Sequence, residues 1–202
     1  MAAAMRRERS AKMFLLLVTL WLPLGFFVWF YLAALFLAPV YLLTKSVFLW
    51  AFPALFSDLE ITRHLFTVVT HIPHPAADGV RGIIQLTVNP MIYGYGLPLL
   101  AALSAATPLS WKERSLQLLA GYAVVALIQI WGTVWESLKL LALDSGPGGR
   151  NAVEATGLSL DGVAVAYQLG TLILPALAPV LVWVALNQPF IREFISNRRG
   201  IA

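Results

Sequence analysis

Long apolar segments alternate with polar ones along the chain, and this pattern predicts membrane-spanning helices. A helix that crosses the hydrocarbon core needs about 20 mostly apolar residues. The predicted spans are residues 13–37, 90–106, 116–143 and 161–186. The first run is too long for the apolar core of a signal peptide, about 7–15 residues, so we interpret it as a retained helix. Pro23 and Gly25 lie inside this run and mark where it would kink.

A further apolar segment, residues 39–56, allows two interpretations. It contains Lys45 and Pro53, and it is either a fifth span or a helix lying in the membrane interface. The distribution of charge favours the second interpretation, an interfacial helix. With four spans and the N-terminus inside, nine of the 14 Lys and Arg residues lie on cytoplasmic flanks. A fifth span would move the WKER loop and the basic C-terminal tail outside, against the positive-inside bias. We therefore predict cytoplasmic termini and an interfacial helix at the outer surface.

The main polar stretch, residues 58–89, reads as a small extracytoplasmic β element. Residues 61–72 and 82–88 are rich in Thr, Val and Ile, and the turn-forming sequence IPHPAADG separates them. A strand pair of this size does not fold alone, so we expect it to rest on the segment at residues 39–56. The predicted fold is an all-α integral membrane protein with four transmembrane helices, an interfacial helix and this β element. Residues 1–202 form one membrane domain, with residues 58–89 as an insertion.

Composition agrees with this class of protein. Hydrophobic residues make up 59% of the 202 residues and charged residues 12%, and a soluble domain of this size could not bury so much apolar surface. The net charge of +4 is explained by basic cytoplasmic flanks, so no nucleic-acid partner is predicted. The absence of cysteine excludes disulfides, thiol nucleophiles and thiolate metal ligands.

Three histidines, His64, His71 and His74, lie in the polar stretch and are enough for a zinc site with an open position. Asp58, Glu60 and Asp78 are near them in sequence. No HExxH motif occurs, and the odd spacing of His64 and His71 would place them on opposite faces of one strand. We interpret the histidines as solvent-facing and predict no metal and no cofactor. GxSxG and nucleotide-binding fingerprints are also absent, and GPGG at residues 146–149 is read as a flexible turn.

Polar residues inside the predicted spans are more informative, because such groups usually face protein or water. Glu136 and Lys139 are three residues apart, and Trp131 and Trp135 are four apart, so each pair shares a helix face. One interpretation is an outer aromatic belt with a snorkelling ion pair. The other is contact with a partner helix.

The ends of three predicted spans meet at the outer boundary, where we expect a partner-binding surface, with packing alone as the alternative. Asn89, Gln129 and Gln168 are also candidates for hydrogen bonds between helices. No catalytic residue is predicted. The candidate partner-binding residues are Asn89, Tyr93, Tyr95, Trp131, Trp135, Glu136, Lys139, Tyr167 and Gln168.

Several segments together resemble a known family. VNPMIYGYGLPLLAALSAATP, QIWGTVWESLK and AYQLGTLILPALAPVLVW, with the opening WLPLGFFVWF, are similar to the exosortase H-associated membrane proteins. Exosortases are multi-span, transpeptidase-like bacterial enzymes that cut C-terminal sorting signals at the outer side of the inner membrane, using a Cys with Arg and His. This chain has no Cys, so the resemblance implies an accessory protein and supplies no catalytic residue.

Three functions remain open from the sequence. The first, which we favour, is a non-enzymatic accessory protein of the bacterial inner membrane, associated with an exosortase-type protein-sorting or surface-assembly system. Its partner would be an exosortase-like enzyme or the C-terminal helix of that enzyme's substrate. The second is a subunit of a transport or export complex. The third is an intramembrane enzyme that uses Glu136 or the histidine loop.

Overall fold

The computed structural model describes residues 2–74 and 82–192, with side chains from 12 to 73 and from 82 to 192. These parts form long helices and one small antiparallel sheet, which confirms the predicted all-α membrane protein with a β element. Most of the predicted IPHPAADG turn and the end of the basic tail lie outside the described residues. Contacts divide the chain into two compact units: Met1–Tyr31, Tyr95–Val125 and Ala176–Ala202 form the first, and Leu32–Gly94 and Ala126–Pro175 the second.

Four helical segments of the described chain are long and apolar enough to cross a membrane. One is the apolar part of α1 (Ala2–Tyr31), and the next is α2 (Ala33–Ala51). The third is α4 (Trp111–Lys139) with the π-helix η2 (Leu140–Asp144). The fourth joins α6 (Leu160–Gln168), the π-helix η3 (Leu169–Ile173) and α7 (Leu174–Leu186). The number equals the predicted four, but the members differ. α2, which overlaps the segment at residues 39–56 predicted to be interfacial, is one of the four, and the predicted span at residues 90–106 is not.

The first difference is a break in the predicted span at residues 13–37. The helix continues past Pro23, where a kink was expected, and α1 ends at Tyr31. Leu32 then takes a ψ angle of 15°, which is outside the helical range, and α2 follows. Since the residues on both sides of Leu32 are apolar, the hydropathy pattern carries no sign of this break.

The second difference lies at residues 90–106, which form two short helices instead of one span. The 3-10 helix η1 (Pro90–Tyr93) is separated from α3 (Gly96–Ala106) by Gly94 and Tyr95. The 11 residues of α3 extend about 16 Å, roughly half the thickness of the hydrocarbon core. The Gly- and Pro-rich sequence NPMIYGYGLP, residues 89–98, covers this interruption.

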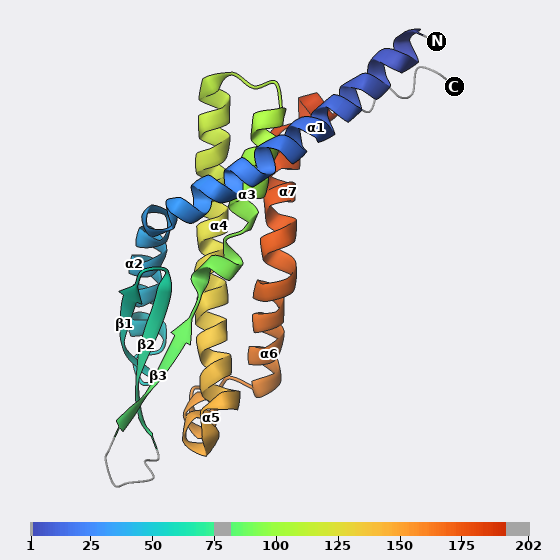
Figure 1. Ribbon diagram of the computed structural model, residues 1–202. Helices are drawn as coiled ribbons and strands as arrows, with labels where there is room; N and C mark the ends of the chain where they lie inside the picture. The colour runs from blue at the N-terminus through green and yellow to red at the C-terminus, as the bar shows by residue number, and fades with distance from the viewer. Residues whose placement is uncertain (1, 75–81, 193–202) are drawn as a thin grey trace. The chain divides into compact units, whose positions relative to one another are not determined.

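The sheet has three antiparallel strands in the order β1-β2-β3 (Figure 1). They are β1 (Phe56–Thr62), β2 (Leu65–His74) and β3 (Gly82–Val88), and β3 has the predicted bounds. The prediction of one strand at residues 61–72 is wrong, because a turn at Arg63 and His64 divides it. Arg63 adopts a φ of 59° there, a conformation that hairpin turns normally assign to Gly or Asn, so the sequence did not signal the turn.

Helix α2 packs against β1 and supports the sheet (Figure 1). The Lys45 ammonium lies 2.5 Å from a carboxylate oxygen of Asp58, and the rings of Phe48 and Phe56 are 4.4 Å apart. The hydrogen bond from Lys45, together with one from the Leu59 backbone N–H, lowers the pKa of Asp58 below its ordinary value. The carboxylate is therefore charged at neutral pH, as the ion pair requires.

A short helix, α5 (Gly146–Ala155), occupies the segment after α4 that was predicted to be a loop. Gly146 has a φ of 77° and redirects the chain, and Pro147 lies in the first turn, where its missing N–H costs nothing. A side chain at Gly149 would overlap the Leu141 carbonyl oxygen. GPGG thus begins a packed helix, and its interpretation as a flexible turn is wrong.

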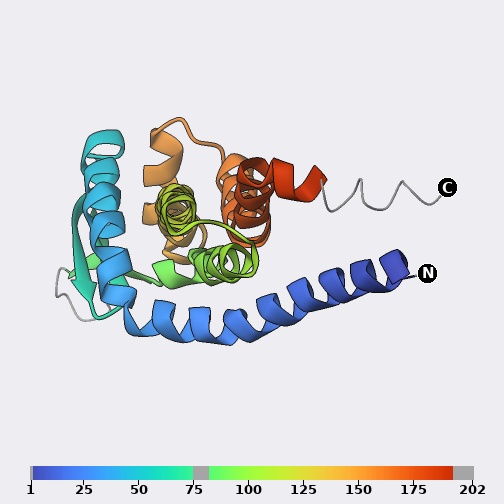
Figure 2. The same cartoon turned by 90° about the horizontal axis from the view of Figure 1, so that it is seen from above.

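In the first unit, three segments distant in sequence gather at one end. Helix α1 packs along α3 (Figure 2). The indole N–H of Trp183 in α7 donates to the hydroxyl of Thr107, which follows α3, at 3.0 Å. The ring of Phe14 lies 5.7 Å from the Trp183 ring. The beginning of the apolar part of α1, the α3–α4 loop and the end of α7 therefore lie together.

Candidate partner-binding site

The centre of the candidate site is a hydrogen bond between Tyr93 and Glu136. The Tyr93 hydroxyl donates to Oε2 of Glu136 at 2.8 Å. Tyr93 ends η1 and is fully buried, whereas Glu136 lies in the second half of α4 and is half-buried. The bond joins two elements 43 residues apart and holds the carboxylate in one orientation.

Two glycines allow this arrangement. A Cβ at Gly132 of α4 would overlap ring atoms of Tyr93, so only glycine lets the ring lie against the helix. A Cβ at Gly170 of η3 would approach Cδ1 of Trp131 to 2.9 Å and the Cα of Gly132 to 3.3 Å. Small residues at such crossings bring helix backbones into close contact, as is common in membrane proteins. The glycines therefore fix the distances between η1, α4 and η3.

The predicted aromatic residues surround this crossing. The Trp131 and Trp135 rings are 5.5 Å apart, and the Trp131 indole N–H donates to the Ala166 carbonyl of α6 at 3.0 Å. The Lys139 ammonium lies 5.8 Å from the centre of the Tyr167 ring, a cation–π distance. Trp131 is 39% exposed, so the cluster presents an aromatic surface as well as packing inside the unit.

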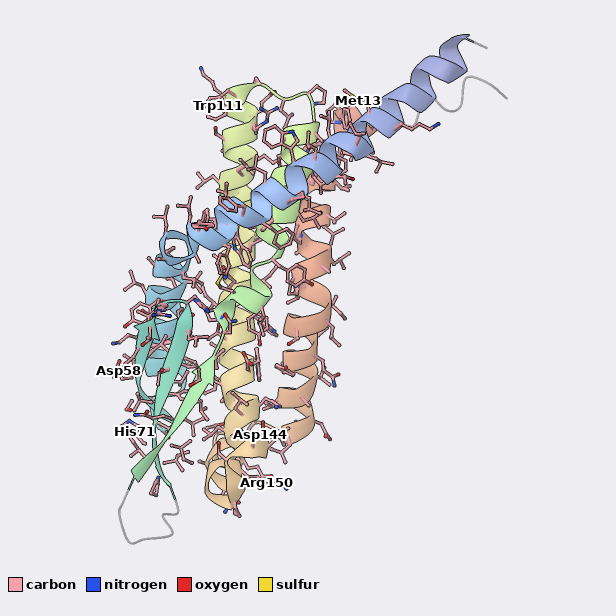
Figure 3. All side chains as sticks on the ribbon, in the orientation of Figure 1. Met13, Asp58, His71, Trp111, Asp144 and Arg150 are labelled. Carbon is pink, nitrogen blue, oxygen red and sulfur yellow. The ribbon has the colours of Figure 1, made fainter. Side chains whose placement is uncertain are left out.

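The ion pairing differs from the belt interpretation, which paired Glu136 with Lys139. Lys139 instead contacts Oδ2 of Asp144 at 2.7 Å, within the turn where α4 passes into η2. Asp144 is the last residue of η2, just before α5, and is labelled in Figure 3. Among the described residues, Glu136 forms no salt bridge, and its hydrogen-bond donor is the neutral Tyr93. No basic side chain among the described residues therefore contacts the Glu136 carboxylate directly.

The remaining predicted residues have different roles. Asn89 caps η1 by accepting from the Met91 N–H at 3.1 Å. Gln129 is buried and donates to the Pro90 carbonyl at 3.1 Å, as expected of a hydrogen bond between helices. Tyr95 belongs to the first unit, where it precedes α3. The cluster of Tyr93, Trp131, Trp135 and Glu136 belongs to the second unit and does not include Tyr95. Gln168 is exposed at the end of α6 and forms no hydrogen bond with a described residue.

The histidines are not gathered into a site in the described structure. His64 lies in the β1–β2 turn and His71 is exposed on β2, where its backbone N–H donates to Leu55. The side chain of His74 and all of Asp78 lie outside the described residues. Within the described side chains, no three His, Asp or Glu residues are placed to hold a metal ion.

Sequence reasoning missed Gly132 and Gly170, which the geometry makes essential to the cluster. Both occur in a Gly-Thr pair within an apolar helix, in IWGT and in QLGT. A lone glycine in such a helix is a weak signal, because it indicates a close approach without indicating to what. Sequence reasoning also missed Asp144 as the partner of Lys139, since that pairing depends on the π-helical geometry of η2.

Hydrogen bonds between helices, close glycine contacts and a carboxylate held by a tyrosine define a multi-span membrane protein with polar groups packed among its helices. The comparisons with known proteins then identify the family. The family model described as "Exosortase H-associated membrane protein" matches residues 8–190, and the chain belongs to that family. The family name indicates association with exosortase H, itself a membrane protein. No curated protein and no solved structure matches the chain.

Proposed function

We propose that this protein is a non-enzymatic accessory subunit of the bacterial inner membrane that binds a transmembrane helix of an exosortase-type system. The bound helix belongs to the exosortase-like enzyme or to the C-terminal segment of its substrate. The observation that carries the proposal is Glu136, a half-buried carboxylate in an apolar helix, oriented by Tyr93 and without a basic partner among the described residues. A charge in such a position is costly unless a partner group offsets the cost.

The surroundings of Glu136 suit a helix as the partner. Trp131 and Trp135 supply rigid aromatic surface, which is enriched in the centres of protein interfaces. Leu169 and Leu172 of the neighbouring η3 segment are exposed and add apolar surface. A partner helix with one Lys, Arg or hydroxyl side chain would satisfy the carboxylate and cover these residues.

Paired substitutions test the proposal. The tagged protein is co-expressed with an exosortase encoded beside it, and the captured exosortase is quantified for the wild type and for Glu136→Gln. We expect capture to fall about tenfold, equivalent to about 1.4 kcal/mol, because a charge-assisted hydrogen bond is lost. Tyr93→Phe should reduce capture less, since it removes only the group that orients the carboxylate.

The matched control is Glu154→Gln, which neutralises an exposed glutamate that pairs with Arg150 on α5. Capture by this variant should equal that of the wild type. Thermal stability and abundance are measured for every variant. If Glu136→Gln and Tyr93→Phe lower abundance and leave capture per folded molecule unchanged, the cluster serves packing and the proposed function fails.

We further propose that both termini are cytoplasmic and that the chain acts as one membrane domain with residues 58–89 outside. The gathering of residue 14, the α3–α4 loop and the end of α7 in the first unit supports this, because the nearby Lys12, Lys112 and Arg192 then share one side. Contact of Lys45 and Phe48 with β1 supports an interfacial position for this part of α2. Because hydrocarbon does not accommodate an open sheet edge, we expect the sheet, and the part of α2 that packs against it, to lie outside the bilayer core.

Single cysteines introduced into this cysteine-free chain test the topology. Glu60→Cys on β1 and Gly148→Cys on α5 should react with a membrane-impermeant maleimide in cells whose outer membrane has been permeabilised. Ser110→Cys, in the α3–α4 loop, should react only after the inner membrane is opened. Labelling of Glu60→Cys on the same side as Ser110→Cys would contradict the topology and make α2 a full span.

A further inference from the structure

A groove of about 550 Å³ lies beside the free edge of the sheet. Residues 84–87 of β3 form one wall, and Leu140 with residues 144–146 form the other. All of these residues belong to the second unit. The volume lies within the range of about 300–1,000 Å³ found for binding pockets. The cluster around Glu136 does not line this groove, so it needs a separate explanation.

The backbone of β3 has hydrogen-bonding groups directed away from the sheet. The Ile84 carbonyl accepts from the Thr70 hydroxyl of β2, so it faces inward. Because backbone groups alternate in direction along a strand, those of Gln85 and Thr87 point toward the opposite edge. In the described part of the chain, no backbone hydrogen bond joins that edge of β3 to another element.

The two edges of the sheet are protected differently. Edge strands usually carry charges or proline, or are covered by another element, because an open edge invites another strand. β1 contains Asp58 and Glu60 and packs against α2. β3 has the sequence GIIQLTV, with no charged residue and no proline, and it borders the groove. The unprotected edge is therefore the one that borders the groove.

We infer that β3 binds an extended segment of a partner protein as a fourth strand, and that this segment carries a basic side chain directed at Asp144. Four residues of β3 line the groove, a length of about 13 Å, which is enough for a short strand addition. Asp144 is the charged residue of the groove wall, and its side chain is 52% exposed although it contacts Lys139. A carboxylate there favours Lys or Arg in the bound segment. The inference does not depend on the helix-binding function proposed above.

The inference is tested with the full chain in lipid nanodiscs and a fluorescent heptapeptide, Thr-Val-Thr-Arg-Val-Thr-Val, with both ends blocked. Binding is followed by fluorescence anisotropy. Backbone N-methylation at alternate residues removes the donors that strand addition needs, and should weaken binding at least tenfold. Replacement of the peptide's Arg by Glu should also weaken it. Equal binding of the N-methylated peptide, or equal binding to empty nanodiscs, would overturn the inference.

Variants of the protein locate the site. Thr87→Pro removes one outward N–H, a change that sheet edges tolerate, and should weaken binding of the Arg peptide about tenfold. Thr87→Val keeps that N–H and is the matched control, with unchanged affinity expected. Asp144→Asn should abolish the preference for Arg over Glu. If instead Gln85→Cys yields a disulfide-linked dimer in the membrane, β3 pairs with a second copy of the chain and the assignment to another protein is wrong.

Discussion

Replacement of Gly132 by valine is expected to prevent stable folding of the second unit. The Cβ would overlap Cγ and Cδ1 of the Tyr93 ring. That ring is fully buried and its hydroxyl is bonded to Glu136, so it cannot move aside without breaking the centre of the cluster. Overpacking of this kind typically costs about 1–3 kcal/mol, and two further methyl groups place valine at or above the upper end. Gly132→Ala should give an intermediate loss.

Fluorescence-detected size-exclusion chromatography after a heat ramp measures this effect as the amount of monodisperse protein that remains. Gly148→Ala on α5 is the matched control. A Cβ there meets only Cγ2 of Ile72 at 3.8 Å, an ordinary contact, so thermal stability should be unchanged or slightly higher. Wild-type stability of Gly132→Val would show that the close contact between α4 and Tyr93 is absent from the folded protein.

Replacement of Gln117 by leucine is expected to destabilise the first unit. Gln117 is 4% exposed; its amide N–H donates to the Ser104 hydroxyl at 2.6 Å, and its carbonyl accepts from the Asn187 amide at 2.8 Å. Leucine has nearly the same size, but it leaves the Ser104 hydroxyl without its partner and the Asn187 amide with only its bond to the Trp183 carbonyl. A buried polar group without a partner costs about 1–3 kcal/mol, and less where a membrane-embedded group finds another partner. The apparent unfolding temperature in detergent should fall accordingly.

A second substitution separates hydrogen bonding from packing. In Gln117→Leu/Asn187→Leu, two of the polar groups are removed together, and stability should recover part of the loss seen in Gln117→Leu. Gln168→Leu, at an exposed glutamine of α6, should change stability little. The single variant Asn187→Leu is measured as well. If the double variant loses as much stability as the two single variants lose in total, the hydrogen bonds between these side chains contribute nothing beyond the packing of each.

Much of the fold follows from the sequence because it depends on composition over long windows. The apolar runs identify a membrane protein, since no soluble core could bury them. The strand Gly82–Val88 was predicted with its observed bounds, because β-branched residues between turn-forming segments are a local signal. The family resemblance, carried by several segments, was confirmed by the match over residues 8–190.

The features that local signals do not encode were decided by tertiary contacts. The helix break at Leu32 and the hairpin turn at Arg63 both occur at residue types that do not favour them. The apolar run at residues 90–106 is interrupted between η1 and α3 at Gly94, where a Cβ would come within 2.5 Å of the Gln129 amide nitrogen.

The candidate site shows the same division. Sequence spacing placed Trp131, Trp135 and Glu136 in one region of a helix, because helical periodicity alone determines which residues of a helix are neighbours. Only the tertiary structure assigned Tyr93 to Glu136 and Asp144 to Lys139. A residue's hydrogen-bond partner depends on which backbones approach closely, and here two glycines far apart in the chain set that approach.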